Sequence, residues 1–351
     1  MLQMSDVERF ELAPDYSIAR IINGCWQLTP DHGGGPGSTK ESLRIFAELV
    51  DCGFTTFDCA DIYIGVEKTL GDFRRSLSDP DSIQIHTKYA ANRDTLHELT
   101  AMDVDAAVDR SLRRLGVERL DLLQYHWWNY EVPGLETMTE RLVRAQEAGK
   151  IRCLGVTNFD TAHVREIVDG GANIISVQAQ YSLIDRRPTK HMSRFAKEAG
   201  IAMLPYGSLA GGFLTKKYLD VRPPSAMNRS LQKYRLIIDE FGGWDAFQGL
   251  LKLLLKIAGK HDTKIGAIAT RWVLDQDCVG AVILGTGKKS RAKENLGLSG
   301  LKLDEEDHHA LADLIQNQPV APGDMYDLER DMEGPHASII KMNLHDDGEN
   351  Q

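Results

Sequence analysis

Residues 120–157, LDLLQYHWWNYEVPGLETMTERLVRAQEAGKIRCLGVT, contain the pattern that decides the fold class of this chain. Two short apolar runs, Leu120–His126 and Cys153–Thr157, flank Leu135–Ala148, where apolar residues recur at helical spacing. Gly149 follows that segment, at a position where glycine accepts the left-handed conformation that ends a helix. Because both runs are continuously apolar rather than alternating, they favour strands that are buried on both faces of a parallel sheet. The stretch therefore predicts a strand–helix–strand unit.

The same alternation of short apolar runs and amphipathic segments recurs along the chain. Eight such units favour an α/β fold of the (β/α)8 TIM-barrel type over an open, doubly wound sheet. An open dinucleotide-binding sheet would need GxGxxG after its first strand, and the glycine-rich residues 33–37 lack that spacing. The other strands are predicted at Ala19–Cys25, Thr55–Cys59, Ile83–Tyr89, Ile174–Gln180, Ala202–Tyr206 and Gly280–Gly285, and the other helices at Ser42–Val50, Val104–Leu115, Ala162–Asp169, Pro188–Ala199 and Ile265–Asp275.

Three segments depart from the regular barrel pattern. Arg9–Leu12 and Ser17–Arg20 flank Ala-Pro-Asp-Tyr and predict an N-terminal β-hairpin that plugs the barrel bottom, so that residues 7–22 hold this hairpin and enter the first strand. A long insertion after the seventh strand covers residues 208–261, and such insertions usually lie on the active face. A C-terminal tail follows at residues 319–351.

The bulk composition is that of a globular protein, with 42% hydrophobic and 26% charged residues, and we expect residues 1–351 to form a single barrel domain. The formal net charge of -10 argues against a nucleic-acid partner, because binding to a phosphate backbone requires concentrated lysine and arginine. The five cysteines form no CxxC pair, which indicates reduced thiols. No secretory signal and no apolar run of the roughly 18 residues that a membrane helix needs is present. We therefore expect a cytoplasmic protein without membrane contact, and nothing in the sequence specifies an oligomeric state.

Polar residues that could move a proton lie at or just beyond three neighbouring strand ends. Asp58 ends the second predicted strand and Tyr63 follows it, Lys88 closes the third strand, and His126 closes the fourth. A buried lysine is costly unless it is paired, so Lys88 beside Asp58 is a sensible couple, and an adjacent ammonium would lower the pKa of Tyr63. His126 would orient a carbonyl oxygen by a hydrogen bond. Taken singly, each residue also has a structural interpretation, as a core histidine, an aromatic packed on a helix or a helix-capping acid, and His86 is expected to point away from the mouth.

The segment Gly53–Gly65 (GFTTFDCADIYIG), followed by Glu67 and Leu70-Gly71, closely resembles the signature of the aldo-keto reductase family. Lys88 at its strand end and Asp121–Trp127 (DLLQYHW) resemble the same family. The resemblance covers Arg20–Asn317 and implies a barrel oxidoreductase. It also implies that the catalytic tetrad consists of Asp58, Tyr63, Lys88 and His126.

The resemblance extends to a nicotinamide cofactor site. Gly155–Phe159 (GVTNF) is similar to the GVSNF segment of the family, Tyr206–Leu214 (YGSLAGGFL) to its YSPLAGGFL pyrophosphate loop, and Ile283–Arg291 (ILGTGKKSR) to its adenosine end. The resemblance implies that Asn158 and Gln178 hold the nicotinamide carboxamide and that Tyr206 stacks on the nicotinamide ring. The cofactor-binding residues that it implies are Gly24, Trp26, Thr157, Asn158, Gln178, Tyr206, Gly207, Ser208, Leu209, Gly211, Gly285, Lys289, Arg291, Glu294 and Asn295.

The resemblance favours NADP(H) as the cofactor. Arg291 would contact its 2′-phosphate, because a guanidinium offers two parallel donors to a dianionic phosphate. One subgroup of the family has lysine where this chain has Gly285, so NAD(H) stays open as an alternative. The sequence contains no metal-ligand spacing such as HxxxH or CxxC, and no metal is expected.

The implied reaction is hydride transfer between NADP(H) and a small carbonyl or alcohol substrate, which would be an aldehyde, a ketone or a sugar. Trp26, Trp127 and Trp128 stand at or just beyond strand ends and predict an aromatic-walled substrate pocket. The insertion and Met325–Ile340 would supply its remaining walls. Two other functions stay open: some proteins that resemble this family are cofactor-bearing regulatory β subunits of ion channels, and a barrel isomerase or lyase would use no nicotinamide.

Overall fold

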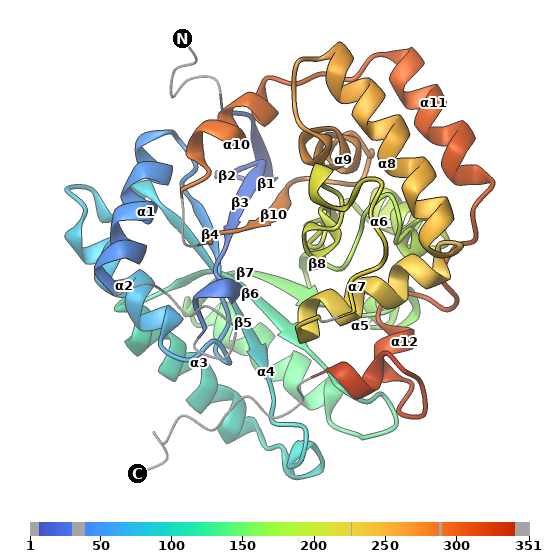
Figure 1. Cartoon of the computed structure of the whole chain (residues 1–351). Coiled ribbons are helices and arrows are strands. Elements are labelled where there is room, and N and C mark those ends of the chain that lie inside the picture. Colours follow the sequence, from blue (N-terminus) through green and yellow to red (C-terminus); the bar gives the residue numbers. More distant parts are fainter. Residues whose placement is uncertain (1–6, 30–38, 226, 288–289, 341–351) are drawn as a thin grey trace.

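A curled sheet of eight parallel strands forms the centre of the computed structural model, which describes residues 7–29, 39–225, 227–287 and 290–340 (Figure 1). Neighbouring strands follow one another along the chain, except that the last strand lies beside the first. The backbone N–H groups of Met203 and Ile283 donate to the carbonyl oxygens of Cys278 and Pro205, and these bonds close the ring. The predicted (β/α)8 barrel is therefore confirmed. Its strands are β3 (Ile21–Gly24), β4 (Thr56–Asp58), β5 (Gln84–Ala90), β6 (Leu120–His126), β7 (Ile151–Thr157), β8 (Ile174–Gln178), β9 (Ala202–Met203) and β10 (Val282–Gly285).

Helices surround this sheet, as the continuously apolar strands predict (Figure 1). Strand β4 is buried throughout, and β6 and β7 are buried except for one residue each. The α-helices that follow the strands are α1 (Thr39–Asp51), α2 (Val66–Ser76), α3 (Ala101–Leu115), α4 (Leu135–Glu147), α5 (Thr161–Asp169), α6 (Met192–Ala199), α9 (Ile265–Leu274), α10 (Ala292–Ser299) and α11 (Glu305–Gln316). Short 3-10 turns lie between them at η2 (Trp26–Leu28), η3 (Pro80–Ser82), η4 (Leu96–Glu98) and η5 (Arg187–Thr189).

Two strands end two or three residues earlier than the sequence predicts. β8 stops at Gln178 and β9 at Met203, although the apolar runs continue to Gln180 and Tyr206. Pro205 interrupts the second run, because proline has no N–H to donate to a ladder. Gln180 and Tyr206 still face each other through an isolated bridge, so Tyr206 lies at the C-terminal mouth of the barrel beyond the regular strand.

Helix α2 is not among the helices that apolar spacing predicts, because its buried face includes Glu67 and Gly71. Glu67 accepts a hydrogen bond from the Thr87 hydroxyl at 2.6 Å and pairs with Arg114 at 3.4 Å. A Cβ atom at Gly71 would lie 2.6 Å from the carbonyl oxygen of Arg114, at the end of α3. The missing side chain therefore lets α2 approach α3 closely.

We expect Gly71→Ala to lower the free energy of unfolding by about 1–3 kcal/mol, because the new methyl group meets backbone that cannot rotate away. Gly249→Ala is the matched control, since Gly249 lies inside a helix and a methyl group added there would have no atom within 4 Å. That control should raise stability by roughly 0.5–1 kcal/mol through the lower entropy of the unfolded chain. Urea unfolding of both variants measures the difference, and equal changes would contradict the close approach of α2 to α3.

The predicted N-terminal hairpin consists of β1 (Arg9–Ala13) and β2 (Tyr16–Ala19), which pair in antiparallel register. It contributes Leu12, Tyr16 and Ile18 to a buried cluster that includes residues from the inside of the barrel. The hydroxyl of Tyr16 lies 3.0 Å from Nε2 of His86. His86 therefore contacts the hairpin at the bottom of the barrel and not the mouth, as expected.

The insertion after β9 contains η6 (Ala210–Gly212), η7 (Lys216–Tyr218), α7 (Arg229–Glu240) and α8 (Gly243–Lys260). The C-terminal segment contains α12 (Asp327–Arg330) and η8 (Ala337–Ile339). Figure 1 shows α7 and α12 on the same side of the barrel mouth.

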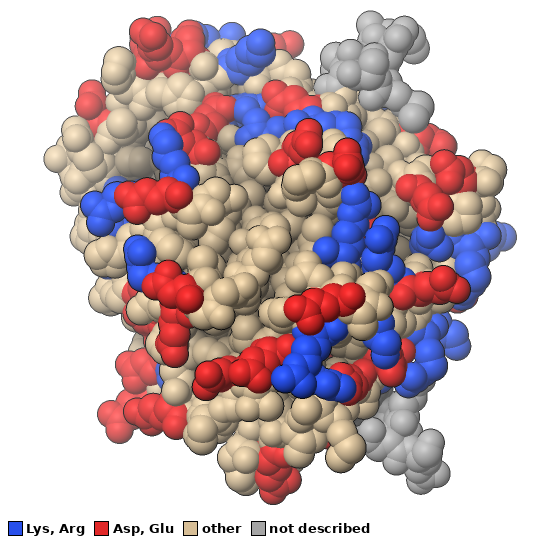
Figure 2. Space-filling model, turned by 180° about the vertical axis from the view of Figure 1, so that it is seen from behind, with Lys and Arg blue, Asp and Glu red and all other residues tan. Residues whose placement is uncertain are grey.

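The opposite face of the molecule, shown in Figure 2, carries lysine and arginine side chains interspersed with aspartate and glutamate, so it is not uniformly basic. Within the described ranges, none of the helices combines the length and the apolar character needed to cross a bilayer. The glycine-rich residues 33–37 lie outside the described residues.

Candidate active site

The four residues of the predicted tetrad meet at the C-terminal ends of adjacent strands. Asp58 and His126 are the last residues of β4 and β6, and Lys88 lies near the end of β5. Nζ of Lys88 lies 2.5 Å from Oδ2 of Asp58 and donates a second hydrogen bond to the carbonyl oxygen of Cys59 at 2.8 Å. The two side chains are only 8% and 5% exposed. Because both charges are withdrawn from water, each depends on the other for compensation.

Two amide side chains complete the hydrogen bonding of Asp58. Its Oδ1 accepts from Nε2 of Gln178 at 2.8 Å and from Nε2 of Gln124 at 3.2 Å. Nε2 of Gln178 also donates to Oε1 of Gln124 at 3.0 Å. The carboxylate is thus bonded on both oxygens, which is the condition for holding a buried ion pair in one geometry.

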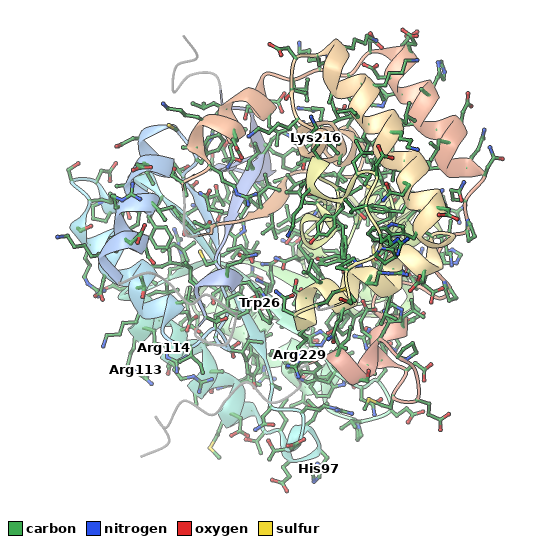
Figure 3. The ribbon with its side chains drawn as sticks, in the orientation of Figure 1. Trp26, His97, Arg113, Arg114, Lys216 and Arg229 are labelled. Carbon is green, nitrogen blue, oxygen red and sulfur yellow. The ribbon has the colours of Figure 1, made fainter. Side chains whose placement is uncertain are left out.

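Tyr63 follows β4 in a tight turn, where its N–H donates to the carbonyl oxygen of Ala60. Nζ of Lys88 lies 5.3 Å from the centroid of its ring. Trp26, which Figure 3 labels near the centre of the view, packs edge-on against this ring with the two ring centroids 4.9 Å apart. Burial raises the pKa of Tyr63 well above its ordinary value, and the charge of Asp58 adds to the rise. The pKa of Tyr63 is therefore raised rather than lowered, because burial outweighs any effect of the adjacent Lys88 ammonium. Tyr63 keeps its proton throughout the physiological pH range.

His126 points into the same space as a neutral imidazole. Burial lowers the pKa of His126 to about 3, and the positive charge of Arg330 adds to this effect. Nδ1 lies 2.9 Å from the carbonyl oxygen of Thr157, which can only accept, so Nδ1 carries the proton. Nε2 is buried and has no partner among the described residues. In this tautomer the neutral ring offers Nε2 as a hydrogen-bond acceptor.

The amides of Asn158 and Gln178 present complementary groups beside this tetrad. The hydroxyl of Tyr206 donates to Oδ1 of Asn158 at 2.9 Å, which leaves the Asn158 nitrogen to donate outward. Nε2 of Gln178 is used by Asp58 and Gln124, which leaves its Oε1 to accept. A primary carboxamide has one acceptor and one pair of donor hydrogens. The two side chains therefore fit the carboxamide of a nicotinamide.

The loop after Tyr206 is shaped by two glycines that contact the insertion. Gly207 and Gly211 have φ angles of 77° and 63°, and a Cβ at either position would lie within 2.6 Å of Tyr234 on α7. Ser208 is buried, with its hydroxyl 3.5 Å from that of Thr270. Gly207 and Gly211 therefore let the backbone of this loop lie close to α7, and the Ser208 side chain is buried beside Thr270.

A small hollow lies between β3, β10, α1 and α10, lined by Asn23, Leu49, Leu284, Gly285, Thr286, Arg291 and Asn295. It brings together three of the predicted adenosine-end residues, Gly285, Arg291 and Asn295. Nζ of Lys264 binds Glu294 at 2.5 Å, so this carboxylate is already paired. Lys289 lies outside the described residues. The hollow supplies a guanidinium and an amide where the adenosine end is expected.

A family model described as the aldo/keto reductase family matches residues 20–316. The chain belongs to this family.

Known members of the aldo/keto reductase family align with most of the chain. Aldo-keto reductase YhdN of Bacillus subtilis is 26% identical over 322 residues, which cover 87% of this chain and 93% of that protein. Aldo-keto reductase yakc of Schizosaccharomyces pombe, whose name specifies NADP(+), is 27% identical over 320 residues and covers 87% of this chain and 90% of its own length. The solved structure of a glycerol dehydrogenase from Gluconobacter oxydans superposes with a TM-score of 0.75 at 26% identity, covering 91% of this chain and 98% of that chain.

The three tryptophans of the predicted substrate pocket differ in their environment in this aldo/keto reductase. Trp26 and Trp128 are partly exposed at the mouth, and Trp128 packs edge-on against His126 at 4.5 Å. Trp127 is fully buried, and its Nε1 donates to the carbonyl oxygen of Val132 at 3.3 Å. Including Trp127 in the pocket is wrong, because the residue after the inward-facing His126 points outward to the helices. Gly24 has a packing role, since a Cβ there would lie 2.7 Å from Ile283.

The C-terminal segment, which was expected to fold over the mouth at Met325–Ile340, contacts the barrel mouth through Tyr326 and Arg330. The ring of Tyr326 packs edge-on against His126 at 5.4 Å. Arg330 donates from Nη2 to the carbonyl oxygens of Trp127 and Asn158 at 2.9 and 2.8 Å. Neither residue stands out in the sequence, because no local spacing distinguishes a tyrosine and an arginine in an irregular acidic tail. Only the return of the chain to the ends of β6 and β7 gives them a place at the site.

Proposed function

We propose that this aldo/keto reductase transfers hydride between NADP(H) and a small carbonyl or alcohol substrate, namely an aldehyde, a ketone or a sugar. The observation that carries the proposal is the arrangement of Tyr63 and the buried Lys88–Asp58 pair beside the complementary amides of Asn158 and Gln178. A proton donor and a carboxamide-binding pair side by side are what nicotinamide-dependent carbonyl reduction requires.

Reduction of a carbonyl needs a hydride and a proton, and a bound reduced nicotinamide would supply the hydride. Tyr63 would supply the proton to the developing alkoxide oxygen, because its raised pKa keeps the phenol protonated and an alkoxide is more basic still. Lys88 is the cation nearest the phenolate that remains, and Asp58 holds Lys88 in place. His126, whose Nε2 is buried and has no partner among the described residues, would line the space around that oxygen.

We propose NADP(H) rather than NAD(H) as the preferred cofactor. Arg291 lines the hollow at the adenosine end and offers a guanidinium to a 2′-phosphate. The name of the fission-yeast relative specifies NADP(+), which supports the same choice.

A cofactor-binding regulatory subunit similar to channel β subunits is not favoured, because the relatives named above are reductases and a dehydrogenase. An isomerase or lyase would give no reason for the paired amides of Asn158 and Gln178. We further propose a cytoplasmic location, supported by five cysteines that are all unpaired in the fold.

To test this function, the purified protein is incubated with a panel of aldehydes, ketones and sugars, and the absorbance of the reduced nicotinamide is followed. Runs with NADPH and NADH in parallel separate the two cofactors. We expect turnover with NADPH for at least one carbonyl class. Failure to bind either reduced cofactor would overturn the proposal, whereas binding without turnover of any carbonyl would favour a regulatory role.

We expect Arg291→Leu to weaken NADPH binding by on the order of tenfold to a hundredfold, the range for hydrogen bonds to a charged group. NADH binding should not change, because NADH has no 2′-phosphate. Lys293→Leu in α10, the helix that Arg291 precedes, is the matched control, since Lys293 is exposed and does not line the hollow. Titration of each variant with both cofactors measures the effect, and an equal loss for NADPH and NADH would argue against a 2′-phosphate contact.

A further inference from the structure

Lys233 of the insertion helix α7 reaches the nicotinamide end of the proposed cofactor site. Its Nζ lies 3.5 Å from the hydroxyl oxygen of Tyr206 and 5.2 Å from the centroid of the Tyr206 ring. The same Nζ lies 5.8 Å from the centroid of the Tyr326 ring in the C-terminal segment. Its side chain is 16% exposed. The insertion therefore contributes a nearly buried cation beside the residue that donates to Asn158.

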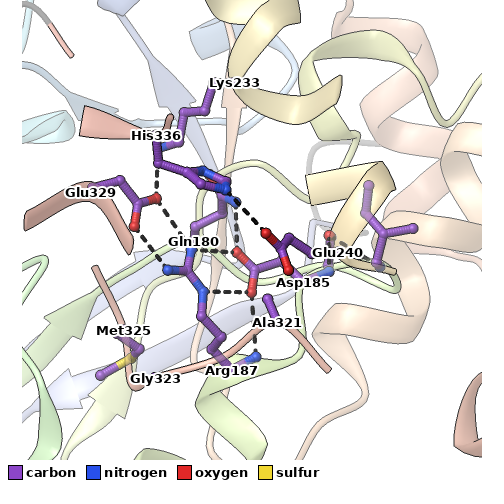
Figure 4. Close-up of polar contacts among 12 residues, drawn as sticks. Gln180, Asp185, Arg187, Lys233, Glu240, Ala321, Gly323, Met325, Glu329 and His336 are labelled. Carbon is purple, nitrogen blue, oxygen red and sulfur yellow. Dashed lines mark hydrogen bonds and ion pairs between the residues drawn. The ribbon is translucent and has the colours of Figure 1, made fainter. Parts of the chain in front are cut away.

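A buried charge network keeps this cation in place (Figure 4). Arg187 binds both Asp185 and Glu329 at 2.8 Å, and Lys233 lies 3.6 Å from Glu329. Two carboxylates and one guanidinium leave an excess negative charge, which Lys233 balances. Burial by itself would lower the pKa of Lys233, but the charge of Glu329 opposes it, and the pKa lies above its ordinary value. Lys233 is therefore a protonated donor.

The direction of the hydrogen bonds around Tyr206 follows from this charge. An ammonium has three donors and no acceptor, so the Tyr206 oxygen must accept from Lys233. The single proton of the hydroxyl then points to Oδ1 of Asn158, where the structure shows a bond of 2.9 Å. Without Lys233, the Tyr206 oxygen is free to accept from the Asn158 nitrogen instead. That reversal would turn the Asn158 oxygen toward the oxygen of a carboxamide and replace attraction by repulsion.

We propose that Lys233 is a positioning residue that sets the orientation of the Asn158 amide through the hydroxyl of Tyr206, and thereby the affinity for the nicotinamide end of the cofactor. This inference rests on the proposed function, because it concerns how a nicotinamide carboxamide is held. A merely structural Lys233 would instead act by neutralising Glu329 and holding the C-terminal segment.

The two roles are separated by a pair of substitutions that keeps the buried network neutral, Lys233→Met with Glu329→Gln. We expect this pair to weaken NADPH binding about fivefold, the ratio that a typical hydrogen bond supports. In a Tyr206→Phe background, where the connecting hydroxyl is absent, the same pair should change NADPH binding less than about twofold. Lys233→Arg, which keeps a donor-only side chain, should retain most of the affinity.

Binding is measured with NADPH by fluorescence and with 2′-phosphoadenosine diphosphoribose, which is the cofactor without its nicotinamide, by competition. Affinity for this fragment should be unchanged by the Lys233→Met and Glu329→Gln pair. Lys252→Met is the matched control, because Lys252 forms an exposed ion pair with Asp220 in the same insertion. Thermal unfolding of each variant reports the state of the fold, and KM for NADPH should change more than kcat.

The outcomes are distinct. An equal loss of affinity for NADPH and for the fragment would overturn the positioning role, and so would an equal loss with and without the Tyr206→Phe substitution. Recovery of wild-type affinity in the charge-neutral pair would also overturn it, because neutralisation of Glu329 would then be sufficient. Wild-type protein that binds no NADPH would overturn the proposed function and this inference with it.

Discussion

Replacing Tyr63 by phenylalanine is expected to lower kcat/KM for NADPH-dependent carbonyl reduction by about 10²- to 10⁴-fold, the range that a positioned general acid contributes. The Tyr63 ring lies beside the Lys88 ammonium, and burial raises the pKa of the Tyr63 phenol well above its ordinary value. The phenol therefore stays protonated and can give its proton to an alkoxide. Phenylalanine keeps the ring and its edge-on contact with Trp26 but removes that proton.

Measuring NADPH binding distinguishes loss of the Tyr63 proton donor from damage to the cofactor site. Dissociation constants for NADPH should agree within about twofold between Tyr63→Phe and the wild type, because the carboxamide contacts lie at Asn158 and Gln178. Tyr130→Phe is a matched control, since that hydroxyl accepts from the backbone of Asp160 outside the tetrad. Unchanged turnover in Tyr63→Phe would exclude the acid role.

Replacing Lys88 by methionine is expected to lower the free energy of unfolding by about 3–5 kcal/mol, because it leaves the carboxylate of Asp58 buried without a counter-charge. The ion pair is almost inaccessible to water, so solvent cannot take the place of the lost ammonium. The same substitution should abolish turnover, since it removes the cation beside the Tyr63 phenolate. Urea or thermal unfolding together with the NADPH absorbance assay measures both effects.

A charge-matched double variant distinguishes the stability effect from the chemical one. Asp58→Asn combined with Lys88→Met removes both charges and should recover most of the lost stability. Turnover should stay absent in the double variant. A double variant as unstable as Lys88→Met alone would show that packing, and not the unpaired charge, carries the loss.

Much of the fold can be predicted from the sequence because its signals are local. The runs at Leu120–His126 and Ile174–Gln180 are recognisable by their apolar residues, and the strands β6 and β8 lie within them. Glycines such as Gly116 and Gly200 mark helix ends where the structure has a positive φ. Helix α2 is the exception, since a buried glutamate and a glycine in close contact with α3 interrupt its apolar face. Burial of Glu67 depends on Thr87 and Arg114, which are distant in sequence.

Local sequence patterns predict the barrel and the meeting of Asp58, Tyr63, Lys88 and His126, because the ends of parallel strands in a closed sheet lie at the same mouth. Tertiary structure decided the properties that depend on surroundings. Burial raises the pKa of Tyr63, and the carbonyl oxygen of Thr157 fixes the proton of His126 on Nδ1. The fold also buries Trp127 completely, whereas the neighbouring Trp128 stays partly exposed at the mouth. It also paired Lys233 with Glu329, which lies far away in the chain, and brought the Lys233 ammonium to the hydroxyl of Tyr206. Local sequence patterns do not predict these contacts, because desolvation and hydrogen-bond direction depend on the groups that the folded chain brings together.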